Sequence, residues 1–113
     1  MADQVQCLRI KLRPGTTDRM VTFLRGLRDR PAEVQASLAL EGMTREALFL
    51  ERTEQGDYLV FYSRAVDLAR AAAAFQTSQL PLDQETMRLI AETWESAVPL
   101  ELIVDLEPDP ASR

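Results

Sequence analysis

Residues 44–63 read TREALFLERTEQGDYLVFYS and predict two neighbouring strands joined by a tight turn. Side chains alternate in character on both sides of the turn: Leu48 and Leu50 share one face before it, as Leu59 and Phe61 do after it. A repeat of two residues is that of an extended strand, and the glycine between the two segments suits a hairpin turn. This stretch therefore predicts an antiparallel hairpin with one face directed toward a hydrophobic core.

The segments on either side of this hairpin extend the pattern. Residues 5–13 alternate strictly and predict a first strand, and residues 100–106 alternate in the same way and predict a last one. Helical spacing precedes and follows the hairpin, and the last helix is expected to begin at Asp83 as its N-cap and to end at Pro99. The order strand, helix, strand, strand, helix, strand predicts an α+β ferredoxin-like βαββαβ fold. In that fold a four-stranded antiparallel sheet, ordered fourth, first, third, second, carries helices on one face.

Length and composition are those of an ordinary globular domain. The chain has 113 residues, of which 46% are hydrophobic and 27% are charged, so we expect residues 1–113 to form one domain with an ordered core at about residues 5–107. Cys7 is the single cysteine, which excludes an internal disulfide and favours a reducing compartment. The N-terminus does not look like a signal peptide, and no apolar run is long enough to span a membrane. The expected location is cytoplasmic.

Several chemistries are excluded by what the sequence lacks. There is no histidine, which removes the usual general base near neutral pH, the commonest zinc ligand and the usual haem ligand. The four glycines form neither a phosphate loop nor a dinucleotide motif, so we expect no cofactor and no metal. A net charge of −5 argues against nucleic acid and against an anionic membrane surface as partners.

The face of the sheet turned away from the helices has an unusual predicted composition. It is too apolar for a wetted surface and too charged for a dry core, and a monomer would rarely leave it uncovered. We therefore expect a homodimer that forms through this sheet face. The predicted members of the face are Cys7, Arg9, Lys11, Phe49, Glu51, Tyr58, Val60, Tyr62, Glu101, Ile103 and Asp105.

Taken together, these features resemble a known group of proteins. The βαββαβ order, the strand at residues 46–49, the hairpin at 56–62 and the helix start at 82–85 are similar to a small uncharacterised bacterial family of the dimeric α/β-barrel superfamily. The resemblance covers roughly residues 6–107. It implies a homodimer with ligand pockets between sheet and helices. The superfamily includes cofactor-independent monooxygenases, lactone isomerases, polyketide cyclases, haem-degrading enzymes and plain ligand binders. Family members often carry a histidine three residues after the aspartate, where this chain has Thr86.

Acidic and phenolic side chains are the candidates for catalysis. Glu46 points toward the helices, where an apolar surrounding would raise its pKa and suit it to acid–base work, unless the end of the strand lets it reach solvent. Tyr58 and Tyr62 share a face and could donate hydrogen bonds to a carbonyl or enolate, or could simply pack in an interface. These three are the predicted catalytic residues.

Four further residues are predicted to contact a substrate. Arg9 could hold an anionic group at a pocket rim, although a ladder of Arg9 and Lys11 with Glu101 and Asp105 is the simpler interpretation. Phe49 and Glu51 lie on the same predicted sheet face, and Trp94 is expected to be core or pocket wall. The resulting hypothesis is a homodimeric, cofactor-independent small-molecule enzyme, such as a cyclase or isomerase of bacterial specialised metabolism. The alternative is a non-catalytic ligand-binding or assembly module.

Overall fold

A four-stranded antiparallel sheet forms the centre of the molecule, whose residues 3–109 are described by a computed structural model. The strands are β1 (Gln4–Leu12), β2 (Met43–Thr53), β3 (Gly56–Ala65) and β4 (Trp94–Pro99). They lie in the order β2-β3-β1-β4, which is the order expected from the sequence. The ferredoxin-like α+β fold is thereby confirmed.

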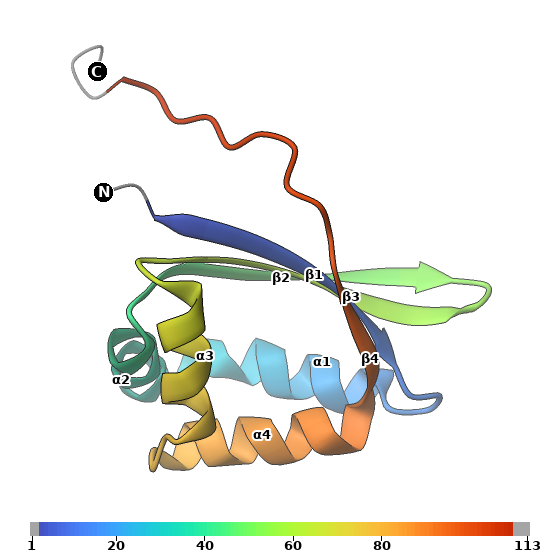
Figure 1. Ribbon diagram of the computed structural model, residues 1–113. Helices are drawn as coiled ribbons and strands as arrows, with labels where there is room; N and C mark the ends of the chain where they lie inside the picture. The colour runs from blue at the N-terminus through green and yellow to red at the C-terminus, as the bar shows by residue number, and fades with distance from the viewer. Residues whose placement is uncertain (1–2, 110–113) are drawn as a thin grey trace.

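Helices cover one face of this sheet and leave the other face open (Figure 1). They are α1 (Thr17–Gly26), α2 (Pro31–Glu41), α3 (Leu68–Gln76) and α4 (Pro81–Thr93), with a 3₁₀ turn at Leu27–Asp29 between the first two. Pro31 and Pro81 stand in the first turns of α2 and α4, where the missing N–H of proline has no partner to lose. The helix layer and the helix-facing side of the sheet enclose the interior of the domain.

Strand pairing arranges the helix-side residues in rows across the sheet. Across β1, β3 and β2 the first row is Ile10, Leu59 and Leu50, the second is Leu8, Phe61 and Leu48, and the third is Gln6, Ser63 and Glu46. The first row belongs to the hydrophobic core, because Ile10 and Leu59 are almost fully buried and pack with Leu12 and Met20. The second row is apolar, and the third is polar.

The last strand lies earlier in the chain than the sequence pattern predicted. α4 ends at Thr93 and β4 begins at the next residue, so neither a helix reaching Pro99 nor a strand at residues 100–106 forms. The carbonyl of Thr93 accepts a hydrogen bond from the Arg13 N–H at 2.7 Å, which holds the chain beside the end of β1 and lets pairing start at once. β4 ends at Pro99, and a last backbone hydrogen bond to β1 follows it, from the Leu100 N–H to the carbonyl of Cys7 at 2.8 Å.

Residues 100–107 continue beyond the sheet as an extended segment, which we call the C-terminal arm. It leaves on the side opposite the helices (Figure 1), where Arg64 of β3 forms ion pairs with Asp105 and Glu107. The arm lies on the open side but is not a strand of the sheet, so the predicted strand at residues 100–106, with Glu101, Ile103 and Asp105 as members of the sheet face, is wrong. The large hydrophobic residues that the arm exposes are Leu100, Leu102, Ile103, Val104 and Leu106.

Candidate functional site

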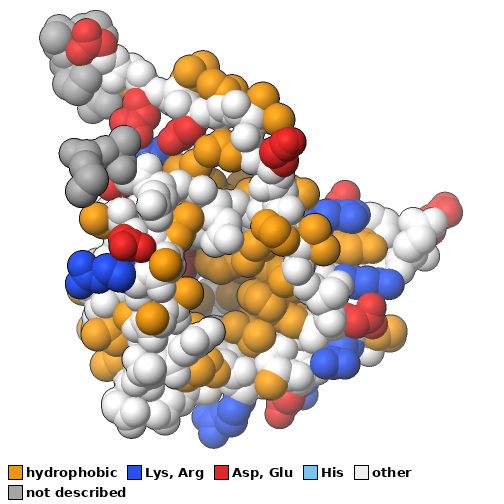
Figure 2. Space-filling view, in the orientation of Figure 1, with side chains coloured by type: hydrophobic (Ala, Val, Ile, Leu, Met, Phe, Trp, Pro, Cys, Tyr) orange, Lys and Arg blue, Asp and Glu red, His pale blue; other side chains and the backbone are white. Residues whose placement is uncertain are grey.

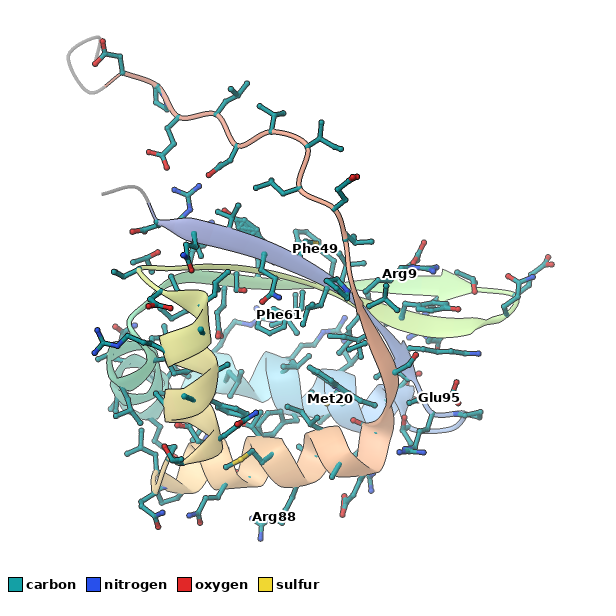
Figure 3. The ribbon with its side chains drawn as sticks, in the orientation of Figure 1. Arg9, Met20, Phe49, Phe61, Arg88 and Glu95 are labelled. Carbon is teal, nitrogen blue, oxygen red and sulfur yellow. The ribbon has the colours of Figure 1, made fainter. Side chains whose placement is uncertain are left out.

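A cavity of about 400 Å³ lies between the sheet and the helices. The apolar row of Leu8, Leu48 and Phe61 forms its sheet side, and helical residues such as Met20 close it from the other side. Figure 3 shows Phe61 and Met20 directed into the space between sheet and helices, and Figure 2 shows a hollow surrounded by hydrophobic side chains on this face of the molecule. The size and apolar walls of the cavity suit a small organic molecule.

Three carboxyl groups reach this cavity from three different elements. Glu41 comes from the end of α2, Glu46 from β2 and Asp83 from the first turn of α4. They are the only titratable residues that line the cavity within residues 3–109, and no Lys or Arg lines it. In the same part of the chain no group of three or more His, Cys, Asp or Glu is placed to hold a metal ion.

Glu46 stands out because its carboxyl group has no hydrogen-bond or ion-pair partner within residues 3–109. It lies in the polar row of the sheet, paired with Ser63 on β3, and it lines the cavity while the residue as a whole stays solvent-exposed. Burial raises the pKa of Glu46 from 4.5 to about 7, and the nearby negative charges of Glu41 and Asp83 add to the effect. A carboxyl group of this kind can exchange protons near neutral pH.

Asp83 has a structural role that differs from the predicted one. The N-cap of α4 is Leu80, and Asp83 lies within the helix with only 2% of its surface exposed. The hydroxyl of Ser37 on α2 donates to one carboxylate oxygen at 2.5 Å, and the hydroxyl of Ser78 donates to the other at 2.6 Å. Asp83 thus joins α2 to α4 at the acidic end of the cavity.

Ser37 also connects Asp83 to Glu41. Its oxygen lies 2.9 Å from a carboxylate oxygen of Glu41, but a hydroxyl has one proton and cannot donate to both acids at once. Its single proton is therefore shared between the two acids, being donated to one of them at a time. Burial raises the pKa of Glu41, the hydrogen bond from Ser37 opposes this, and the charge of Asp83 adds to the increase.

The opposite end of the cavity is marked by Trp94 at the start of β4. This residue lines the cavity, as the sequence predicted for a core or pocket-wall residue. Its indole Nε1 is buried and finds no acceptor within residues 3–109. Thr86 also lines the cavity. Its hydroxyl donates to the carbonyl of Leu82 at 2.8 Å, so its proton is already used within α4.

The other predicted site residues lie on the open face, across the sheet from the cavity. Tyr58 and Tyr62 alternate along β3 with the core residues Leu59 and Phe61, so their rings cannot reach Glu46. The structure therefore does not bring the three predicted catalytic residues together: Glu46 lines the cavity, and Tyr58 and Tyr62 lie on the other face of the sheet. Side chains alternate between the faces of a strand, and these residues fall on opposite faces.

Arg9 and its neighbours form a separate cluster on the open face. The guanidinium of Arg9 pairs with Glu51 at 3.0 Å and lies 3.7 Å from the centre of the Tyr58 ring. Lys11 pairs with Glu95 at 3.5 Å. The expected ladder with Glu101 and Asp105 does not form because those residues belong to the arm. Phe49 also lies on this face, and Figure 3 shows it on the side of the sheet away from Phe61.

Sequence reasoning missed two of the residues that shape the acidic end. Ser37 and Glu41 are four residues apart on α2, a spacing that places side chains together on one helix face and could have indicated the pair. Their contact with Asp83 joins residues 46 positions apart, and no local pattern reports it.

Family membership follows from a match that covers almost the whole chain. Residues 3–111 match a family described as a family of unknown function, DUF6176. The chain belongs to this family. No curated protein matches the sequence.

Solved structures with the same fold share little sequence with this chain. PA3566 from Pseudomonas aeruginosa is 17% identical with a TM-score of 0.58, covering 90% of this chain and 93% of that one. A dimeric protein of unknown function and ferredoxin-like fold from Bacteroides fragilis is 17% identical with a TM-score of 0.54, covering 85% and 91%. A candidate antibiotic biosynthesis monooxygenase from Bacteroides thetaiotaomicron is 16% identical with a TM-score of 0.57, covering 96% and 97%. At these identities the likeness concerns the fold.

Proposed function

We propose that this protein is an enzyme that rearranges a small, largely apolar molecule by acid–base chemistry, with Glu46 as the group that takes up and returns the proton. The observation that carries the proposal is the unpartnered Glu46 carboxyl, with its pKa of about 7, in the wall of an apolar cavity. A group whose pKa lies near the working pH can act both as base and as acid.

Isomerisation or ring closure is the reaction type that this site supports best. Glu46 removes a proton from one carbon of the substrate and the same proton returns to another atom, so atoms and electrons balance without an oxidant or cofactor. The apolar walls of the cavity suit the hydrocarbon part of such a substrate. The antibiotic biosynthesis assignment of one protein of the same fold is our reason to place the substrate in bacterial specialised metabolism.

The test compares the wild type with Glu46→Gln, which keeps the size of the side chain and removes its titration. Each purified protein is incubated with a small-molecule extract of a producing bacterium, and the mixture is followed by mass spectrometry for a compound that changes retention time at constant mass. We expect such a conversion with the wild type and a loss of at least ~100-fold in rate with the variant. Equal profiles for the two proteins would overturn the catalytic proposal.

Ligand binding without chemistry is the second candidate. It is favoured by the scarcity of free acid–base groups beside Glu46 within residues 3–109: Asp83 is held by two serines, Glu41 contacts Ser37, and both tyrosines lie across the sheet. In the same experiment a binding module would retain a compound and release it unchanged. The two functions are therefore separated by the fate of the bound molecule.

We infer in addition that two copies associate through their open sheet faces. A row of side chains across all four strands, formed by Phe49, Val60, Arg9 and Val98, presents apolar surface there, and Phe49 is 61% exposed. The C-terminal arm adds more apolar surface on the same side. An exposed patch of this extent is typical of a protein interface. A protein of the same fold is dimeric, which supports this inference.

A further inference from the structure

The cavity has a strongly one-sided electrostatic character. Its wall holds three carboxyl groups and no cationic side chain. Two arginines outside the wall are already paired with other acids and do not neutralise these carboxyl groups. Arg30 pairs with Glu33 and Glu85, and Arg64 pairs with Asp105 of the arm. Arg88 of α4 points away from the cavity (Figure 3). The acidic end therefore keeps a negative potential that nothing in its wall neutralises.

This potential selects among the kinds of molecule that could enter. A carboxylate or phosphate would be repelled by like charge. A neutral molecule would leave the electrostatic repulsion among the three carboxyl groups unchanged. A divalent metal ion requires several ligands at short range, and the three carboxyl groups are not grouped closely enough to hold one. A protonated amine needs only one or two carboxylates and supplies three hydrogen-bond donors.

We propose that the cavity binds an amine, a molecule with an apolar body and one protonated amino group that lies against Glu46 and Glu41. The inference rests on the proposed function, because it names the substrate class of the same cavity. Glu46 offers both carboxylate oxygens, since it makes no bond within residues 3–109. Glu41 offers the oxygen that does not face Ser37.

The far end of the cavity provides an independent sign that a polar ligand is accommodated. Trp94 lines the cavity, and its indole N–H is buried and lacks an acceptor within residues 3–109. An unpaired buried donor costs free energy, and a ligand acceptor that met this N–H after a turn of the ring would remove that cost. Trp94 follows α4 while Asp83 lies in its first turn, so the two ends are separated by about 15 Å along the helix. The preferred amine is therefore elongated.

Proton release distinguishes an amine from other ligands. At a pH close to 7, part of the Glu46 population is protonated. The charged groups that face Glu46 are Glu41 from α2 and Asp83 from α4. The uncharged residues Gln6 and Ser63 lie beside it on the sheet. A bound ammonium favours the carboxylate, so binding expels this proton. A neutral ligand of equal size expels none.

The experiment uses three probes of matched shape: 4-phenylbutylamine, 4-phenylbutanol and 4-phenylbutanoate. Calorimetric titrations of the full protein near pH 7, in two buffers of different ionisation enthalpy, give the affinity and the number of protons released. For the wild type we expect the amine to bind at least ~10-fold more tightly than the alcohol, with no binding of the carboxylate and release of up to about half a proton with the amine. Glu46→Gln should abolish the proton release, and Glu51→Gln on the open face should not.

Two outcomes would contradict the inference in different ways. If the alcohol binds as tightly as the amine, or if the amine binds without releasing a proton, the amine proposal is overturned while the cavity remains a binding site for the proposed function. If none of the three probes binds but the metabolite experiment finds a converted compound that carries no amino group, the amine proposal again fails and the enzymatic proposal stands.

Discussion

Glu46 makes the stability of the protein depend on pH in a direction opposite to that of most carboxylates. Its pKa rises from 4.5 to about 7 on folding, so the native state binds the proton more tightly than the unfolded chain does. The associated stability is fully present below the unfolded pKa and is lost as the pH rises through 7. Glu46→Gln should therefore leave the free energy of unfolding unchanged near pH 4 and increase it by ~1 kcal/mol near pH 8, a value reduced for solvent access.

Urea unfolding of the wild type and the variant at the two pH values measures this difference. Glu51→Gln is the matched control, because Glu51 lies on the same strand but in an exposed ion pair with Arg9. Its substitution should change stability by a few tenths of a kcal/mol at either pH. If Glu46→Gln has the same effect near pH 4 and near pH 8, the raised pKa is wrong.

Asp83 shows a different use of a carboxylate in the same cavity. Removal of its side chain leaves the hydroxyls of Ser37 and Ser78 without acceptors in a buried place and breaks the link between α2 and α4. We expect Asp83→Ala to lower the free energy of unfolding by ~3 kcal/mol. Asp67→Ala removes a true helix cap, the acceptor of the Arg70 N–H at the start of α3, and should cost about 1 kcal/mol.

Urea denaturation of both variants gives the comparison. Equal losses for Asp83→Ala and Asp67→Ala would mean that Asp83 acts as an ordinary cap, which is the role that the sequence suggested. An aspartate before a helical stretch looks like a cap in the sequence whether or not it acts as one. The two serines that hold Asp83 lie on α2 and between α3 and α4, so no local pattern reports the contacts. Only the packed structure brings these residues together.

Glycines at the ends of two helices provide a test at the scale of the element. Gly42 ends α2 with a φ of +67°, a conformation that side chains other than that of glycine rarely adopt, whereas Gly26 at the end of α1 has a φ of −65° and open space where a Cβ would lie. We expect Gly42→Ala to destabilise the protein by about 1 kcal/mol. Gly26→Ala should stabilise it by ~0.5 kcal/mol because the unfolded chain loses freedom.

Thermal unfolding of both variants followed by circular dichroism provides the measurement. A loss of stability with Gly26→Ala as large as that with Gly42→Ala would contradict the assigned helix ends. Gly42 follows α2 directly, and a glycine that follows a helical stretch is a frequent C-terminal signal.

The strands show where sequence patterns stop being informative. The hairpin and the first strand were predicted closely because each has one buried and one open face, which imposes a repeat of two on its residues. The C-terminal arm carries the same repeat without belonging to the sheet, whereas β4 has a weaker repeat and does belong to it. β4 is a short edge strand, and the hydrogen bond between Arg13 and Thr93 decides where it begins.

The whole molecule places two different sets of side chains on the two faces of one sheet. The helix face holds the cavity and its acids, and the open face holds the aromatic and ion-pair cluster around Arg9. The alternation of the strands already predicted that Glu46 lies on one face and Tyr58 and Tyr62 on the other. The sequence could not show that Ser37, Glu41 and Asp83 join Glu46 at one cavity, because they come from two separate helices, α2 and α4.

Association through the open face is the prediction that belongs to the whole molecule. Phe49→Asp places a charge at the β2 end of the open-face row of Phe49, Val60, Arg9 and Val98, where burial in an interface would leave it unpaired, and it should convert the protein to a monomer at micromolar concentration. Leu40→Asp is the matched control, because Leu40 is 50% exposed on α2, on the helix side of the sheet, and its variant should stay dimeric. Sedimentation velocity measures the state of each, and circular dichroism checks that both fold.

A chain that ends after Pro99 extends this test to the C-terminal arm. It lacks the apolar side chains of the arm and the ion pairs of Arg64, but it keeps every strand of the sheet. If the arm covers part of the partner, the shortened chain should dissociate more readily than the wild type, by at least ~10-fold in Kd. A wild type that sediments as a monomer would contradict the association itself. An unchanged Kd for the shortened chain would confine the interface to the sheet, because the arm then buries no apolar surface that association requires.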